Sequence, residues 1–148
     1  GAEAAKPEDV FRGRIVITDS RLPSRFASQN AFIQAVNRAS IDKVWPQEEK
    51  GNDHAVWKFE YIAFFARPLN DNEITVKFWE LGMGSPRFVA GDEQYTRERG
   101  SRIFSAAITV AKPEFDTNKQ YRMTIESGGR VIAERVHHHG VGARPSFG

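Results

Sequence analysis

Apolar and polar residues alternate with a period of two along most of the chain, and the pattern is clearest close to its C-terminal end. Alternating runs over 121–126 and 131–136 flank a four-residue segment with Gly128 and Gly129 at its centre. Alternation places every second side chain on the same face of a strand, and a Gly-Gly pair suits a tight turn between antiparallel strands. This part of the sequence therefore predicts a β-hairpin.

The same alternation predicts further strands upstream, from about Val10, over 55–67, over 73–81 and over 102–110. A short edge strand is expected to begin at Phe88, whereas the charged segment 92–100 is expected to form a loop. Turn-forming residues separate these runs, which is typical of antiparallel sheets that pack face to face. We therefore predict an all-β, mainly antiparallel fold in which two sheets form a sandwich.

A single helix is predicted over 28–39, inserted after the first strand. Ser28 is a suitable N-cap, because its hydroxyl can accept a hydrogen bond from a free amide of the first turn. Apolar residues recur at helical spacing on one side of this segment, at Ala31, Phe32, Ala35, Val36 and Ala39. The strand over 55–67 is apolar on both faces near Ile62 and Phe64, so we expect the helix to cover that end. A partner or a second copy of the chain is the alternative cover.

The 148 residues are enough for one domain, which we place at 10–139. Residues 1–9 lack an apolar period and are expected to be a flexible linker, and 140–148 are expected to be a flexible tail. The chain opens with Gly1 and a linker-like segment, which favours a domain excised from, or matured within, an exported protein. We therefore expect a periplasmic, extracellular or cell-surface location, with the cytoplasm as the open alternative.

Composition argues against several classes of function. The 21 basic and 19 acidic residues are interspersed, and a formal charge of +2 is too small to indicate a polyanion partner, so we expect no nucleic acid to bind. No cysteine is present, which excludes disulfides, thiolate metal ligands and cysteine nucleophiles. The longest apolar stretch without a charge, about 103–111, is far shorter than the roughly 20 residues that span a bilayer, so no membrane insertion is expected.

The residues before the predicted hairpin carry a resemblance at the level of the fold. In the segment 113–121, a turn with Asp116, Thr117 and Asn118 leads into a strand that starts with Tyr121. This arrangement resembles the corner before the penultimate strand of immunoglobulin-like and fibronectin type III-like sandwiches, where a tyrosine hydrogen-bonds back to the preceding turn. The resemblance implies an immunoglobulin-like sandwich with a binding or spacer role, although fold alone does not determine function.

Catalytic and metal chemistry have weak support in the sequence. His137 and His139, the outer two of three consecutive histidines, share a face if the last strand continues, which makes them weak candidates for metal ligands. A polar strand edge is the simpler interpretation of these histidines. No serine lies in a Gly-x-Ser-x-Gly elbow. We therefore expect neither enzyme activity nor a cofactor.

Exposed aromatic and basic side chains are the best candidates for contacts. Trp79 lies at an outward-facing position of its predicted strand, which is unusual for a large apolar ring. Trp45 and Tyr95 extend the aromatic set, which would suit the face of a sugar ring or a peptide. Arg97 and Arg99 lie in the charged segment expected to form a loop, where they belong either to a contact region or to a solvated surface.

These observations favour a non-catalytic protein–protein interaction domain of an exported or cell-envelope bacterial protein. The expected partner is another protein, with a homodimer left open. A carbohydrate-binding module of the same fold class, with a sugar stacked on Trp79 or Trp45, is the first alternative. A histidine-dependent metal-binding protein is the second.

Overall fold

The computed structural model of the protein describes residues 5–48, 55–96, 99–111, 115–116 and 119–135. Two antiparallel sheets form the body of this structure. The strands in these residues are β1 (Ile15–Thr18), β2 (Gln47–Glu48), β3 (Ala55–Phe64), β4 (Glu73–Leu81), β5 (Arg87–Tyr95), β6 (Ile103–Ala111), β7 (Gln120–Ser127) and β8 (Arg130–Arg135). The helices are α1 (Pro7–Val10) and α2 (Gln29–Ala39). The prediction of a mainly antiparallel two-sheet sandwich with an inserted helix is therefore confirmed.

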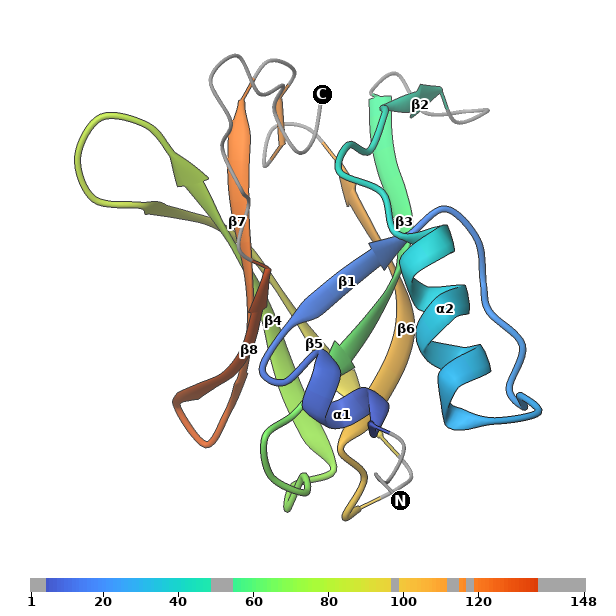
Figure 1. The fold of residues 1–148 in the computed structure, drawn as a ribbon. Helices are drawn as coiled ribbons and strands as arrows, with labels where there is room; N and C mark the ends of the chain where they lie inside the picture. Colours follow the sequence, from blue (N-terminus) through green and yellow to red (C-terminus); the bar gives the residue numbers. More distant parts are fainter. Residues whose placement is uncertain (1–4, 49–54, 97–98, 112–114, 117–118, 136–148) are drawn as a thin grey trace.

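Each sheet is built around one long central pairing. In the first, which we call the β3 sheet, β3 pairs with β1 and β2 along one edge and with β6 along the other. In the second, the β4 sheet, the order is β5-β4-β7-β8. Figure 1 shows the two sheets facing each other, with α2 on the outer side of the β3 sheet. An isolated parallel bridge between Arg14 and Glu134 joins the two sheets at the β1 and β8 side.

The main core lies between the sheets and is rich in aromatic rings. Phe115 is fully buried at its centre, stacked on Tyr121 with ring centroids 4.2 Å apart. Its ring also meets Phe78 edge-on at 5.0 Å and Trp57 at 5.7 Å. Because these rings come from β3, β4, β7 and the segment before β7, their contacts hold the two sheets together.

A second, smaller core lies between α2 and the outer face of the β3 sheet. Phe64 of β3 is fully buried there, with its ring 4.8 Å from Phe11 and 6.2 Å from Phe32. Val36 of α2 and Ile62 of β3 belong to the same buried cluster. The predicted cover of the apolar end of this strand is therefore confirmed. The predicted cap is present too, since the Ser28 hydroxyl accepts a hydrogen bond from the Ala31 N–H at 3.0 Å.

The N-terminal segment differs from the expectation of a flexible linker running into a strand. Residues 7–10 form α1, with Pro7 buried at the first helical position, where its missing N–H costs nothing. The first strand begins only at Ile15. Arg102 holds this segment in place, because its Nη2 donates to the Asp9 carboxylate at 3.2 Å while its Nε donates to the Phe65 carbonyl at 3.0 Å.

The expectation of a loop over 92–100 is wrong for its first half. Asp92 and Glu93 lie within β5, which continues to Tyr95 and pairs with β4 along its length. The β5 strand lies at the edge of its sheet, so both carboxylates reach solvent without leaving the strand. Backbone pairing with β4 therefore determines the conformation here, despite a polar sequence.

The C-terminal hairpin forms as predicted. Gly128 and Gly129 both have positive φ, 58° and 78°, which the tight turn between β7 and β8 requires and which other residues adopt at a cost. The Tyr121 hydroxyl accepts a hydrogen bond from the Asp116 N–H at 2.8 Å, so this tyrosine is tied to the preceding turn as expected. Residues 1–4 and 136–148, including the expected tail, lie outside the described part of the chain.

Candidate functional site

The outer face of the β4 sheet is the side of the sandwich that neither α1 nor α2 covers (Figure 1). Trp79 lies on this face, as predicted, and its indole N–H donates to the Thr124 hydroxyl of β7 at 2.9 Å. The indole therefore lies across the sheet, over Thr124. Thr124 is only 4% exposed although it is on the outer face. The ring of Trp79 is therefore held in one orientation at a surface position.

Phe88 of β5 completes an aromatic pair with Trp79. The two residues are opposite each other in the register, and their rings meet edge to face at 5.5 Å. Phe88 is half exposed, at 50%. Its ring lies over Gly91, where an added Cβ would come within 3.3 Å of the Phe88 ring. Glycine at this position leaves room for the ring to lie flat along the strand.

A lysine borders the aromatic pair. The Lys77 Nζ is 6.0 Å from the centroid of each ring and 2.9 Å from the Glu126 carboxylate. The lysine charge is therefore within reach of both aromatic faces while its ion pair with β7 limits its movement. We call Lys77, Trp79, Phe88 and Gly91 the Trp79–Phe88 surface.

The opposite end of the same face is acidic. Tyr95 is 70% exposed there and pairs with Glu73, six positions along β4 from Trp79, which is about 20 Å at the usual rise of a strand. Tyr95 and Trp79 are thus on one face but do not form one site. The neighbouring Glu93 carboxylate is the main reason that the pKa of Glu73 is raised, with burial and Asp71 adding to the effect.

This crowding predicts a pH-dependent effect on stability. In the folded protein the raised pKa of Glu73 disfavours its charged form, so ionised Glu73 opposes folding above that pKa, and the cost disappears as pH falls below the ordinary value of 4.5. We expect Glu73→Gln to raise Tm slightly at neutral pH and to leave Tm unchanged well below pH 4.5. Thermal unfolding followed by circular dichroism measures this. Glu126→Gln is the control, which should lower Tm at neutral pH because it removes the Lys77 ion pair.

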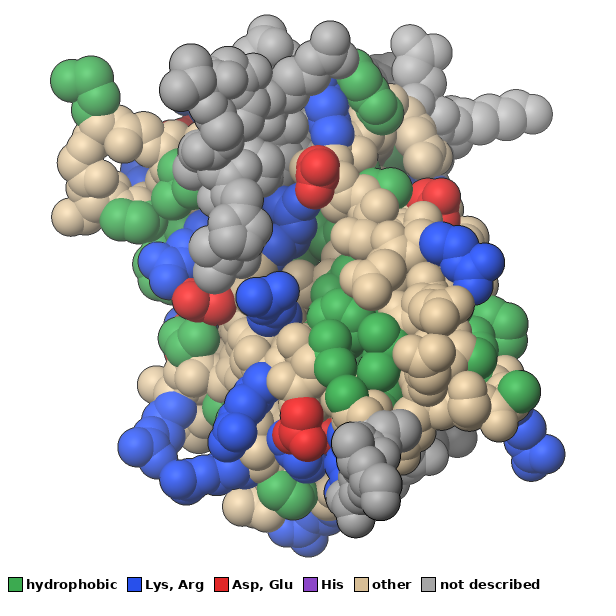
Figure 2. All heavy atoms as spheres, viewed as in Figure 1, with side chains coloured by type: hydrophobic (Ala, Val, Ile, Leu, Met, Phe, Trp, Pro, Cys, Tyr) green, Lys and Arg blue, Asp and Glu red, His purple; other side chains and the backbone are tan. Residues whose placement is uncertain are grey.

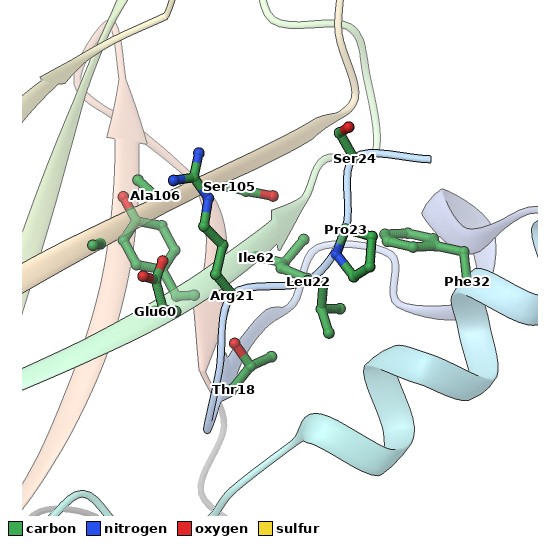
Figure 3. Close-up of a pocket in the computed structure, with 12 residues that line it drawn as sticks. Thr18, Arg21, Leu22, Pro23, Ser24, Phe32, Glu60, Ile62, Ser105 and Ala106 are labelled. Carbon is green, nitrogen blue, oxygen red and sulfur yellow. The ribbon is translucent and has the colours of Figure 1, made fainter. Parts of the chain in front are cut away.

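A cleft of about 330 Å³ lies on the other side of the molecule, over the β3 sheet. Its floor includes Ile62 and Ser105, and the segment after β1 forms one wall. Figure 3 shows the Arg21 side chain extending across the sheet, so that its guanidinium lies near Ser105, with Glu60 on the neighbouring strand. Within the described residues, the Arg21 guanidinium has no ion-pair partner.

Trp45 lies on this second side, next to an adjoining groove of about 450 Å³. It is 59% exposed, and the Lys43 Nζ lies 3.8 Å from the centroid of its ring. Polar side chains that include Lys58 and Glu60 line the same groove. Because Trp45 and Trp79 belong to opposite faces of the sandwich, the structure does not bring these two predicted contact residues together.

Arg99, the one remaining candidate that the structure describes, is separate from both surfaces. Arg99 donates to the Asn70 carbonyl through Nε at 2.9 Å and Nη2 at 2.7 Å, so it supports the loop before β4. Arg97, His137 and His139 lie outside the described residues. In the part of the chain that is described, no three His, Cys, Asp or Glu residues are grouped so that they could hold a metal ion. The same residues include no helix with the length and apolar character needed to cross a membrane.

Sequence reasoning identified Trp79 but missed its partner Phe88. The pair depends on a register shift between Phe78 and Trp79, which places Phe88 opposite Trp79. Only the alternation near Phe88 pointed to a strand there, and it gave no information on register. Comparisons with family models, with curated proteins and with solved structures find no match to this chain.

Proposed function

We propose that this chain is a non-catalytic protein–protein interaction domain of an exported or cell-envelope bacterial protein, and that it binds its partner through the Trp79–Phe88 surface. One observation carries the proposal. Two aromatic rings are packed edge to face on a sheet face that neither α1 nor α2 covers, and one of them is half exposed. Contiguous exposed aromatic surface of this kind commonly marks an interaction site.

The rigidity of the aromatic pair supports a binding role. The Trp79 indole is held by Thr124 and the Phe88 ring by Gly91 and Trp79, so little conformational freedom remains for a partner to remove. Tryptophan is enriched among the residues that contribute most to interface energy. A partner that covers the Phe88 ring with an apolar side chain would shield both Lys77 and Glu126 from water. Because these two residues stay paired with each other, neither charge would be buried without a partner.

We further infer that the sandwich is of the immunoglobulin-like, fibronectin type III-like kind. Two features support this inference: β5 joins β4, β7 and β8 in one sheet, and Tyr121 bonds back to the turn before β7. Domains of this architecture often bind through a sheet face or through loops at one end. The inferred architecture therefore indicates which surfaces are expected to bind, but it does not identify the partner.

The proposal is tested by quantitative co-purification from envelope extracts of the native source, followed by affinity measurement with the purified partner. Phe88→Ala should weaken binding about 30-fold, the usual effect of truncating an interface ring that contributes most of the energy. Tyr95→Ala is the matched control, because Tyr95 is also exposed and aromatic on β5 but lies at the acidic end of the face. Equal loss of binding in both variants, or none in Phe88→Ala, would contradict the proposal.

A carbohydrate-binding module is the second candidate, and Trp45 is the observation that favours it. An exposed indole beside a groove lined by lysine and glutamate side chains offers stacking and hydrogen bonding together, as sugars require. A glycan array, read with tryptophan fluorescence, separates the two candidates. Sugar binding that is lost in Trp45→Ala and kept in Phe88→Ala would favour this candidate. If no glycan on the array binds, the carbohydrate-binding function is excluded.

A further inference from the structure

β6 differs from the other edges of the two sheets. Its nine residues, Ile103–Ala111, include no charged residue, no proline and no glycine. Natural proteins usually protect an exposed edge with charges, proline or bulges, because its free backbone groups invite another strand. An edge strand without such protection in the described structure therefore needs an explanation.

The other edges are protected in recognisable ways. β5 carries Arg87, Asp92 and Glu93, and its pairing with β4 contains a register shift. β8 begins with Arg130 and ends at Arg135, and Figure 2 shows Lys and Arg side chains gathered over β8 and its turn. The edge of β1 is occupied by the segment after α2, where the Ile41 N–H donates to the Ile17 carbonyl at 2.9 Å.

Hydrogen bonds identify the backbone groups that point out of the β6 edge. The Phe65 N–H donates to the Arg102 carbonyl at 2.8 Å, so even-numbered residues of this segment face β3. Residues along a strand alternate in direction, which leaves Ser105, Ala107 and Thr109 with their N–H and C=O groups directed outward. The Gln94 side chain agrees with this direction, because its amide reaches the Ala107 carbonyl from the β4 sheet at 3.5 Å.

The free part of the edge is a short window. At one end, the Ser101 hydroxyl accepts from the Ile103 N–H at 3.1 Å and donates to its carbonyl at 2.7 Å. At the other end, the Ala111 carbonyl accepts from the Phe115 N–H at 3.1 Å. Within the described residues, the N–H groups of Ser105, Ala107 and Thr109 have no acceptor. Three donors two residues apart match the spacing at which an added strand would pair.

Space and chemistry beside this window favour a particular kind of strand. On the inner side, a groove of about 470 Å³ opens between β5 and β6, with Phe78, Ile108 and Val110 among its lining residues. On the outer side, the small side chains of Ser105, Ala107 and Thr109 are exposed, and Arg21 lies beside Ser105 (Figure 3). A strand added here would alternate between an apolar groove and a surface with an uncompensated cation.

We propose that β6 binds an extended segment of another protein as an additional strand of the β3 sheet, over Ser105–Thr109. The segment has apolar residues at the positions that face the groove and an acidic residue at the position that faces Arg21. Main-chain hydrogen bonds would supply affinity and the alternating side chains specificity, which is the usual division in strand addition. The inference rests on the proposed role in protein binding, but it names a surface other than the Trp79–Phe88 surface.

Charge argues for a foreign segment over a second copy of β6. In a two-fold pairing centred on Ala107, the Ser105 of each chain would face Thr109 of the other. Thr109 is the register partner of Lys58 and lies in the groove that also contains Lys43. Self-pairing would therefore bring Arg21 towards these lysines on both sides of the axis. An acidic residue opposite Ser105 or Thr109 would instead meet Arg21 or the lysines, while Glu60, the register partner of Ala107, is the carboxylate between them.

The test uses the whole chain and a short synthetic peptide in which valine and glutamate alternate. We expect NMR shift changes centred on residues 105–109, and slower hydrogen exchange of the Ser105, Ala107 and Thr109 amides. The same peptide with N-methyl groups on alternate amides should not bind, because it cannot donate to the edge. A peptide of alternating valine and lysine should bind at least tenfold more weakly. Changes centred elsewhere, or no binding, would overturn the proposal.

Variants of the window separate this proposal from the proposed function. Ala107→Pro removes an N–H that makes no bond to β3, so the fold should tolerate it, while peptide affinity should fall about tenfold or more. Ala107→Glu, which keeps the N–H but places a negative charge beside the glutamates of the peptide, is a second variant with the same expected direction. Arg21→Glu should reverse the preference between the two peptides. Unchanged affinity in the Ala107 variants would overturn the inference.

Trp79→Ala is the control for the other surface and should leave the peptide affinity unchanged. If it abolishes capture of the native partner while Ala107→Pro does not, the proposed function stands and strand addition fails. If Ala107→Pro alone abolishes capture, strand addition stands and the role of the Trp79–Phe88 surface fails. Sedimentation that shows a dimer lost in Ala107→Pro would identify a second copy as the occupant, which overturns the proposal of a foreign segment.

Discussion

Replacing Phe115 with alanine is expected to lower the free energy of unfolding by about 3–5 kcal/mol, the usual cost of deleting a buried phenylalanine ring. Phe115 is fully buried and meets Trp57, Phe78 and Tyr121, so its removal leaves a cavity bounded by rings that come from both sheets. Rigid rings collapse into such a space less readily than flexible side chains do. The loss would be a large share of the roughly 5–15 kcal/mol that stabilises an ordinary domain.

Urea denaturation followed by tryptophan fluorescence measures this effect, with the slope of the transition checked for change. Phe115→Leu is the matched control, because leucine keeps much of the buried volume and should cost clearly less than alanine. Tyr121→Phe separates packing from hydrogen bonding, since it keeps the stacked ring and removes only the hydroxyl that accepts from Asp116. That variant should cost about 1 kcal/mol. A Phe115→Ala loss of that same size would contradict the central role assigned to this ring.

Phe64→Ala is expected to have a comparable cost, again about 3–5 kcal/mol, but with a different pattern of consequences. Phe64 is fully buried between the β3 sheet and the two helices, with Phe11 and Phe32 as its ring neighbours. Its loss weakens the docking of α1 and α2 without removing a contact from the main core, because the two buried clusters share no residue. We therefore expect α2 to open locally before the sandwich unfolds.

Hydrogen exchange followed by NMR distinguishes this pattern from uniform destabilisation. Amides of α2 should lose protection in Phe64→Ala under conditions where amides of β4 and β7 keep theirs. Phe115→Ala is the comparison, in which all elements should lose protection together. Because the two sites lie in separate clusters, the double variant should show additive losses within about 0.5 kcal/mol. Strong coupling between the two substitutions would show that the clusters act as one core.

Features that depend on neighbouring residues were predicted well. The hairpin turn follows from Gly128 and Gly129, which adopt the positive φ that the turn needs. The start of α2 follows from Ser28, whose hydroxyl caps the first turn. The cover of β3 by α2 could also be predicted, because a strand with two apolar faces at one end must be buried on both sides.

Features that depend on pairing between distant segments were not predicted from the sequence, or were predicted only in part. Asp92 and Glu93 suggested a loop, yet they lie in β5, because an edge strand tolerates charges that point to solvent. Arg99, which stays a predicted contact residue, donates to the Asn70 carbonyl, a bond between distant segments that no local pattern indicated. The contact between Trp79 and Phe88 could not be predicted, since it depends on how β4 and β5 are aligned.

The uncharged stretch 103–111 shows where the limit lies. In the sequence it predicted a strand and argued against a membrane span, whereas in the fold the same residues form an edge at which the amides of Ser105, Ala107 and Thr109 have no acceptor among the described residues. Period-two alternation assigns the two faces of each strand, because successive side chains point in opposite directions. Contacts between residues far apart in the chain determine the order of the strands. That order in turn decides that β6 is an edge strand and that the Phe88 ring is exposed. No local sequence pattern carries information about such contacts.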